Sequence, residues 1–166
     1  MPTIRLATLA DAAALQPLIQ RAYRGEAARA GWTHEADMLE GERISLADLY
    51  DLLATPTERV LIAEEDGAPI GCVRVTDLGG ESAYLGMLAV EPGRQAAGLG
   101  RTLVAAAEEL ARDTLGAARM EMTVIDRRSE LIAWYGRRGY RPVGTCPFPL
   151  AVEPPLAMVV LAREIA

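Results

Sequence analysis

The chain has 166 residues, a length typical of one domain with a core of its own. Hydrophobic residues make up 51% of it and charged residues 24%, which excludes the disordered and fibrous classes. The formal net charge is −6, so a nucleic acid, whose binders usually present a basic surface, is not an expected partner. An excess of acidic residues also suits a small enzyme that acts on a cationic amine.

No stretch of the sequence is apolar over the roughly 18 residues that a membrane-spanning helix needs. The first residues lack the basic stretch followed by an apolar one that a secretory signal shows, so we expect a cytoplasmic protein. Cys72 and Cys146 stand in apolar surroundings, and we expect two buried free thiols. A metal site is not expected, because one histidine, His34, and two separated cysteines cannot form one.

The first part of the chain indicates a short strand followed by two helices. Residue alternation predicts the strand, and apolar residues at helical spacing predict the helices. Thr8 with Asp11 resembles a capping box before the first helix, and Ser45 is the N-cap candidate of the second. We expect a strand at 3–7, a helix at 12–23, an irregular or short-helical segment at 24–44, and a helix from Ser45 that ends before Pro56.

From residue 59 onward, strands alternate with helices. Asp66-Gly67 predicts a tight hairpin, and Gly116 and Gly139 are typical helix ends. Ser129 is expected as a helix N-cap. We expect strands at 59–65, 68–77, 82–90, 119–125, 140–146 and 157–163, helices at 101–115 and 129–138, and a turn at 92–100. Without repeats or linkers, the sequence predicts one α+β domain over residues 1–166.

The glycine-rich turn Gln95-Ala96-Ala97-Gly98-Leu99-Gly100 joins a predicted strand to a predicted helix. Such a turn binds phosphate, because the first amides of the helix are free and glycine lets the backbone come close. A Walker A loop would need Gly-Lys-Ser/Thr, whereas Arg101-Thr102 follows here. A dinucleotide fingerprint would need Gly or Ala where Leu103 stands. These residues alone leave open a helix start without any ligand.

Two segments together resemble a known family. Val90-x-Pro92 followed by Gln95-x-x-Gly98-x-Gly100 resembles the acyl-CoA-binding motif of the GNAT superfamily of N-acetyltransferases. Leu131 to Tyr140, with Tyr135 ahead of Gly139-Tyr140, resembles the late helix of that family. The chain is similar to the family over essentially its whole length. The resemblance implies a three-layer α/β/α sandwich with a mixed, mostly antiparallel sheet, and acetyl-CoA as the cofactor.

The resemblance also implies roles for single residues. The backbone of Leu88 to Val90 would pair with the pantetheine arm of CoA like an added strand, with the Leu88 N–H as oxyanion donor. Tyr135 would be the general acid, a task that suits a phenol with a pKa of about 10; from the residues alone it is a packed aromatic of an amphipathic helix. The expected cofactor-binding residues are Leu88, Ala89, Val90, Gln95, Ala96, Ala97, Gly98, Leu99, Gly100, Arg101 and Tyr135.

The general base is left open by the sequence. In the histone-acetylating branch of the family, a glutamate lies four residues before the oxyanion donor, and this position is Tyr84 here. Glu81 is an alternative that would act through water, as are Glu35 and Asp37. Tyr84 and Glu81 complete the candidate catalytic residues with Tyr135 and Leu88. The acceptor side is expected at Tyr23, Trp32 and Glu35, because the family commonly forms it between the first two helices.

The expected activity is acetyl transfer to the primary amine of a small molecule or an amino-acid-like acceptor. Two other functions stay open. One is a catalytically silent acyl-CoA sensor or assembly module, which the missing carboxylate at Tyr84 favours and Tyr135 disfavours. The other is transfer to protein lysines or N-termini. Because dimers are common in the family, a homodimer is a further expectation.

Overall fold

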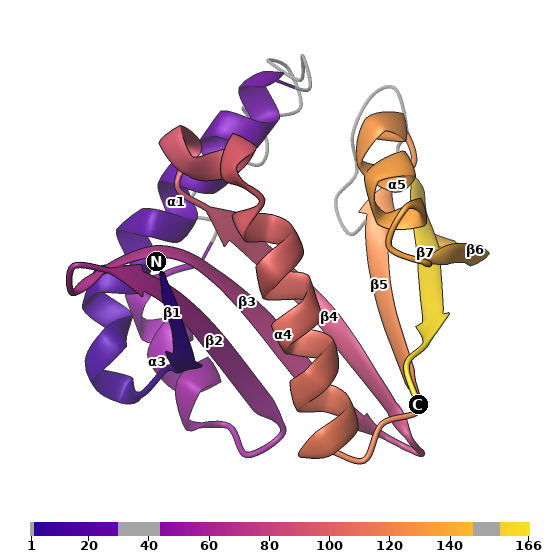
Figure 1. Ribbon diagram of the computed structural model, residues 1–166, viewed down its shortest axis with the longest axis horizontal. Coiled ribbons are helices and arrows are strands. Elements are labelled where there is room, and N and C mark those ends of the chain that lie inside the picture. Colours follow the sequence, from indigo (N-terminus) through magenta and orange to yellow (C-terminus); the bar gives the residue numbers. More distant parts are fainter. Residues whose placement is uncertain (1, 30–43, 148–156) are drawn as a thin grey trace.

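The computed structural model describes residues 2–29, 44–147 and 157–166. Within them, seven strands form one sheet in the order β1-β2-β3-β4-β5-β7-β6 (Figure 1). Neighbouring strands are antiparallel, except that β4 and β5 run parallel. The expected α+β fold with a mixed, mostly antiparallel sheet is therefore confirmed.

The elements follow the predicted order along the chain. Strands and helices are β1 (Thr3–Leu6), the 3₁₀ helix η1 (Leu9–Asp11), α1 (Ala12–Arg29), α3 (Leu46–Ala54), β2 (Glu58–Glu65), β3 (Ala68–Gly79), β4 (Ser82–Val90), the 3₁₀ helix η2 (Pro92–Ala97), α4 (Leu99–Asp113), β5 (Arg119–Ile125), α5 (Ser129–Gly136), β6 (Arg141–Pro147) and β7 (Ala157–Glu164).

Local signals account for several of these boundaries. Asp66 and Gly67 both have positive φ, 54° and 78°, which is the conformation of the tight hairpin turn that they predict. The Ser45 hydroxyl accepts a hydrogen bond from the Asp48 N–H at 3.0 Å, so the predicted N-cap of α3 is confirmed. The Asp11 carboxylate accepts from the Thr8 N–H at 2.7 Å, as a capping box requires.

Several predicted helix boundaries are wrong by a few residues, including the ends of α4 at Asp113 instead of 115 and of α5 at Gly136 instead of 138. The helix α1 continues to Arg29 instead of ending at 23, because Gly25 weakens a helix without breaking it. The helix α4 begins at Leu99 and not at Arg101, since its N-cap is Gly98 in the left-handed conformation, with φ 79°. In α5 the N-cap is Arg128, and Ser129 is already the first helical residue.

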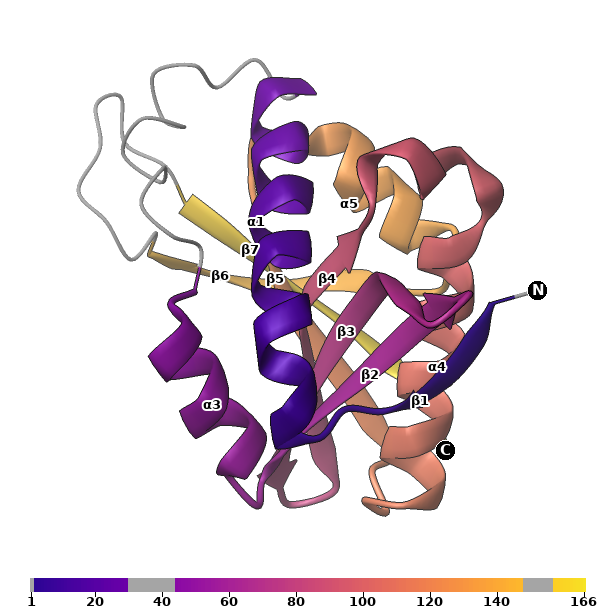
Figure 2. The same cartoon turned by 90° about the vertical axis from the view of Figure 1, so that its left-hand side faces the viewer.

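Two apolar cores cover the two faces of the sheet. One contains α4 and α5, represented by Leu103 and Tyr135. The other contains α1 and α3, represented by Leu15 and Leu49, on the opposite side of the strands (Figure 2). Burial in this second core raises the pKa of the Cys72 thiol to about 12. Cys146 on β6 is only half-buried, so the expectation of two buried thiols is wrong for this one. Among the described helices, none is long and apolar enough to span a membrane.

The strands β4 and β5 diverge after a short parallel ladder. Ser82–Tyr84 pair with Arg119–Glu121, and no later residue of β4 is in register with β5 within the part that the structure describes. Figure 1 shows the two strands moving apart toward the carboxyl end of β4. We call this feature the strand fork. It leaves one backbone edge of β4 without a neighbouring strand in the middle of the sheet.

A β-bulge lies on β4 inside the strand fork. Gly86 pairs with Arg74 and Ala89 pairs with Cys72, so that Met87 and Leu88 together face Val73. Met87 takes a positive φ of 50° there. The extra residue shifts the alternation of side chains by one position. Before the bulge the odd-numbered residues Ala83 and Leu85 face α4, and after it the even-numbered residues Leu88 and Val90 face α4.

Candidate active site

The strand fork, the bulge and the glycine turn are consecutive along the chain. Leu88 stands in the bulge, two residues before the end of β4, and the glycine turn starts five residues after β4 ends. The side chains of Leu88, Leu99 and Tyr135 all belong to the core beneath α4. The predicted oxyanion donor, the first residue of α4 and the predicted general acid are thus on the same face of the sheet.

Two ion pairs anchor the segment that leads into the glycine turn. Glu91, directly after β4, accepts hydrogen bonds from Arg21 of α1 at 3.0 and 2.7 Å. Arg94 in η2 pairs with Glu65 at the end of β2. These contacts lower the pKa of both carboxyl groups. Glu65 already neutralises Arg94, whereas Arg101, on the first turn of α4, forms no ion pair with the described residues and is left for an anion.

The amino end of α4 has the features of a phosphate site. Gly98 reaches a left-handed conformation that residues with a Cβ rarely adopt, and no side chain caps the helix. The first amides of α4 therefore have no intrahelical acceptor and point out of the helix end. Gly71 of β3 lets α4 sit close to the sheet, because a Cβ on it would lie 2.9 Å from Leu103 Cδ1. For Gln95 to Ala97 the structure describes the backbone of η2 only.

Tyr135 is packed between two aromatic rings. It is 5% exposed, and its ring meets Trp134 edge-on at 4.9 Å between centroids. Tyr140 meets it edge-on from another side at 5.9 Å. Edge-to-face contacts of this kind fix the plane of a ring. Tyr135 therefore has one orientation on α5, as a proton donor requires, although the packing alone would also suit a structural aromatic.

Tyr84 lies on the other face of the sheet, close to the start of the strand fork. Its neighbours Ala83 and Leu85 face α4, so its side chain projects toward the α1 side. The hydroxyl groups of Tyr84 and Thr123 are 2.6 Å apart, in a hydrogen bond that bridges β4 and β5. Thr123 was not among the predicted site residues, because only the parallel pairing of β4 with β5 brings the two hydroxyls together.

Glu81 is not brought to the site. It precedes β4, has a φ of 69° and is exposed. Its carbonyl oxygen accepts hydrogen bonds from the N–H groups of Ala118 and Arg119 at the start of β5. Seven residues of nearly extended chain separate it from Leu88, a distance of about 20 Å. A proton cannot pass from the reacting amine to Glu81 through one water over this distance.

The expected acceptor residues are only partly within the described part of the chain. Tyr23 belongs to α1, whose backbone passes beside the carboxyl half of β4, and its side chain is not described. Trp32, Glu35 and Asp37 lie outside the described residues. In the described ranges, no group of three or more His, Cys, Asp or Glu side chains comes together as metal ligands would.

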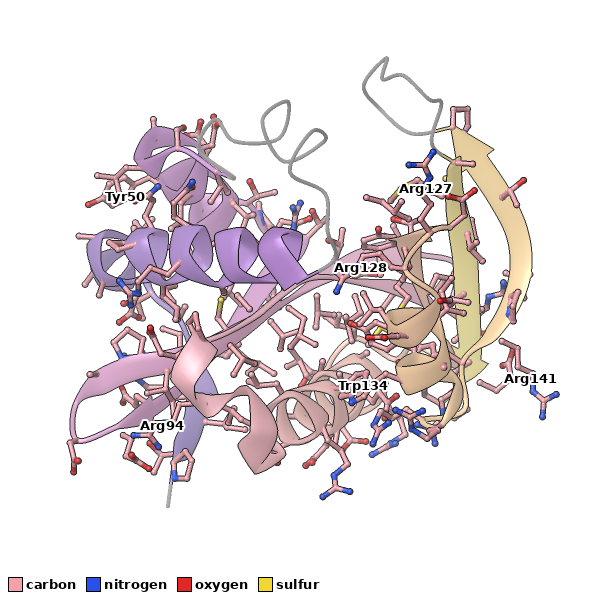
Figure 3. All side chains as sticks on the ribbon, turned by 90° about the horizontal axis from the view of Figure 1, so that it is seen from above. Tyr50, Arg94, Arg127, Arg128, Trp134 and Arg141 are labelled. Carbon is pink, nitrogen blue, oxygen red and sulfur yellow. The ribbon has the colours of Figure 1, made fainter. Side chains whose placement is uncertain are left out.

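The side chains around Trp134 form a feature that the sequence interpretation did not include. The Arg138 guanidinium lies over the indole, with its Cζ 4.2 Å from the ring centroid. The indole in turn borders the glycine turn, since a Cβ on Gly100 would lie 3.6 Å from Trp134 Cζ2. Figure 3 shows Trp134 beside α4 and Arg141 pointing away at the outer edge of β6. The spacing of four between Trp134 and Arg138 was the available signal, as such residues are neighbours on a helix.

Comparisons with known proteins agree with this geometry. A model of the acetyltransferase (GNAT) family matches residues 17–140, which include the strand fork, the glycine turn and Tyr135. Among solved structures, the chain is similar to the ribosomal-protein-S18-alanine N-acetyltransferase from Escherichia coli, with 18% identity and a TM-score of 0.79 over 100% of this chain and 95% of that one. A comparison with the curated proteins gives no match.

Two further similar structures were solved with a ligand. The PaiA N-acetyltransferase from Thermoplasma acidophilum, in complex with coenzyme A, has 16% identity and a TM-score of 0.78 over 99% of each chain. YncA from Salmonella typhimurium, with its cofactor acetyl-CoA, has 20% identity and a TM-score of 0.75 over 100% of this chain and 95% of that one. These likenesses show the shared fold. Since the family model spans well over half of the sequence, the chain belongs to the GNAT family of acetyltransferases.

Proposed function

We propose that this chain transfers the acetyl group of acetyl-CoA to the primary amine of a small-molecule or amino-acid-like acceptor, within a single domain of residues 1–166. The observation that carries the proposal is the strand fork, which holds the Leu88 bulge and continues directly into the glycine turn. A homodimer, the family's common state, would leave this site intact in each copy, because all the residues named come from one chain.

The residues at the site fit acetyl-CoA. The first amides of α4, with Arg101 above Gly98, would hold the pyrophosphate. The edge of β4 in the strand fork would accept the pantetheine arm as an added strand, since its amides there have no strand partner on β5 among the described residues. The similar structures solved with coenzyme A and acetyl-CoA support this choice of ligand.

The chain's own groups then have separate tasks. The cofactor supplies an acetyl group activated as a thioester. The Leu88 N–H donates a hydrogen bond to the carbonyl oxygen, and a backbone donor of this kind contributes about 3 kcal/mol in the transition state. The Tyr135 hydroxyl would give its proton to the departing thiolate. A phenol suits this task because it still carries its proton at neutral pH.

The acceptor would approach from the α1 side of the sheet. The hydroxyl pair of Tyr84 and Thr123 lies on that face, and either oxygen can accept a hydrogen bond from an amine. Tyr84 thereby orients the nucleophile instead of deprotonating it. Tyr23, Trp32 and Glu35 are proposed to line the rest of the acceptor side, with Glu35 or Asp37 as the proton acceptor.

Two measurements test the proposal. Millimolar acetyl-CoA should raise the unfolding temperature, because a ligand of the native state stabilises it by mass action. A screen of primary amines that follows the release of free CoA should then identify the acceptor class. Absence of any thermal shift would contradict the choice of cofactor. A shift without CoA release from any amine would point to the acyl-CoA sensor instead.

Replacing Gly98 should abolish this binding. The change Gly98→Val forces a β-branched residue to adopt a φ near 79°, so the turn must rearrange and its amides no longer converge. We expect the affinity for acetyl-CoA, measured by calorimetry, to fall by at least about a hundredfold. The matched control is Gly93→Val in η2, where the space around a Cβ is open and φ is ordinary. Equal losses in both variants would contradict the role of the turn.

A further inference from the structure

Three arginines, one on the first turn of α4 and two at the end of α5, have no carboxylate partner among the described residues. Seven arginines of the described chain form ion pairs, namely Arg5, Arg21, Arg74, Arg94, Arg112, Arg119 and Arg163. Arg101, Arg137 and Arg138 form none with any carboxylate in the same described ranges. We call these three residues the arginine cluster.

The contacts of the arginine cluster connect it to the turn. A Cβ on Gly98 would lie 3.6 Å from Nη2 of Arg101, so this guanidinium is beside the amino end of α4. On α5, the Trp134 ring borders Gly100 and carries Arg138 on its face. Nη1 of Arg138 also donates to the Trp134 carbonyl oxygen at 2.7 Å. The Arg138 guanidinium is thus held in one place by a ring and a hydrogen bond.

The gathering of these charges is unfavourable without an anion. Partial burial lowers the pKa of Arg138, and the positive charges of Arg137 and Arg101 lower it further. Arg138 lies at the carboxyl end of α5, where cations are stabilised, and this position explains its hydrogen bond to the Trp134 carbonyl oxygen. This effect does not account for Arg101, which lies at the amino end of α4, where the helix dipole disfavours a cation.

We propose that the arginine cluster binds the phosphate on the 3′ carbon of the CoA ribose, so that the chain selects CoA over 3′-dephospho-CoA. The inference rests on the proposed function. If the α4 amides hold the pyrophosphate, the third phosphate of CoA lies on the ribose that is attached directly to this pyrophosphate. A guanidinium matches a phosphate with two parallel hydrogen bonds, and Arg138 is already oriented by Trp134.

Calorimetric titration with CoA and with 3′-dephospho-CoA tests this subsite, because the two ligands differ only in that phosphate. We expect the native chain to bind CoA about tenfold more tightly. In Arg137→Gln and Arg138→Gln the ratio should fall toward one, while the affinity for 3′-dephospho-CoA stays close to that of the native chain. Arg137 is exposed and its side chain forms no hydrogen bond or ion pair with the described residues, so its replacement leaves the fold intact.

Arg141→Gln is the matched control, since Arg141 is also an exposed arginine and points away from Trp134 (Figure 3). It should keep the native ratio. A native chain that binds both ligands equally, or cluster variants that weaken both by the same factor, would overturn the inference and leave the proposed function standing. A native chain that binds neither ligand would overturn the proposed function itself.

Discussion

Tyr135 shows how much of a catalytic assignment can be tested at a single residue. Its ring is fixed by edge-on contacts with Trp134 and Tyr140, and these contacts do not involve the hydroxyl group. Phenylalanine keeps the ring and therefore these two edge-on contacts. A role in packing and a role in proton transfer thus predict different outcomes for the same substitution.

In Tyr135→Phe we expect the turnover number to fall by about a hundredfold, because the thiolate then leaves without a positioned proton donor. The dissociation constant of acetyl-CoA, measured by calorimetry, should stay within about twofold of the native value. The control is Tyr50→Phe on α3, since Tyr50 is exposed and lies far from α5 in Figure 3. Unchanged turnover in Tyr135→Phe would rule out the general-acid role.

At the scale of elements, a charged contact ties the start of α1 to the edge of the sheet. Arg5 on β1 donates to Asp11 at 2.9 and 2.8 Å and to Glu64 on β2 at 2.9 Å. The hydrogen bonds from Arg5 lower the pKa of Asp11 from 3.8 to about 2. In the folded chain, Asp11 therefore stays charged at a lower pH than in the unfolded chain.

This difference predicts a pH-dependent contribution to stability. Because the folded-state pKa is the lower one, the contribution is complete above about pH 4 and is lost as the pH falls through about 2. In Asp11→Asn we expect the unfolding temperature to be about 1–3 °C lower than that of the native chain at pH 7, and this difference to shrink to a small fraction near pH 2, where about half of the folded-state Asp11 is protonated. Asp51→Asn, an exposed carboxylate of α3, is the control. A difference that is as large at pH 2 as at pH 7 would mean that packing and not charge is responsible.

At the scale of the whole molecule, the ladder of β4 and β5 is too short to join the two halves of the sheet by itself. A buried polar contact adds to it. Glu108 of α4 is 9% exposed and accepts hydrogen bonds from the Tyr140 hydroxyl at 2.7 Å and from Arg163 Nη1 at 2.9 and 3.0 Å. Burial and the adjacent carboxylate raise the pKa of Tyr140, which therefore remains the donor.

Removing this contact should destabilise the fold. Tyr140→Phe leaves one buried carboxylate oxygen with fewer donors, and we expect a loss of about 1–2 kcal/mol in the free energy of unfolding, measured with urea. Arg163 is more than a third exposed, so its ion pair should contribute less than the tyrosine bond. Glu109→Gln, on the exposed side of α4, is the control and should lie within about 0.5 kcal/mol of the native value. A loss of about 0.5 kcal/mol or less in Tyr140→Phe would show that the hydrogen bond from Tyr140 to Glu108 does not hold the two halves of the sheet together.

The same three scales separate what the sequence could predict from what it could not. Periodicity and turn residues predicted every described strand to within two residues, because they depend on neighbours in the chain. The bulge had no such signal, since Met87 and not a glycine takes the positive φ. The contacts of Glu108 with Tyr140 and of Tyr84 with Thr123 join residues 32 and 39 positions apart, so they follow from the packing of whole elements.

The strand fork has a consequence for amide hydrogen exchange. Leu61 and Ile62 of β2 pair with strands on both sides, β1 and β3, and their amides should exchange only when the sheet opens. On β4, Leu88 stands in the bulge without a register partner on β3, and the edge toward β5 has no strand partner among the described residues. The Leu88 amide should therefore exchange with solvent deuterium within the first seconds in the free protein and slow markedly when acetyl-CoA is added. Slower exchange at Leu88 on addition of acetyl-CoA would indicate that the pantetheine arm pairs with this edge of β4 like an added strand.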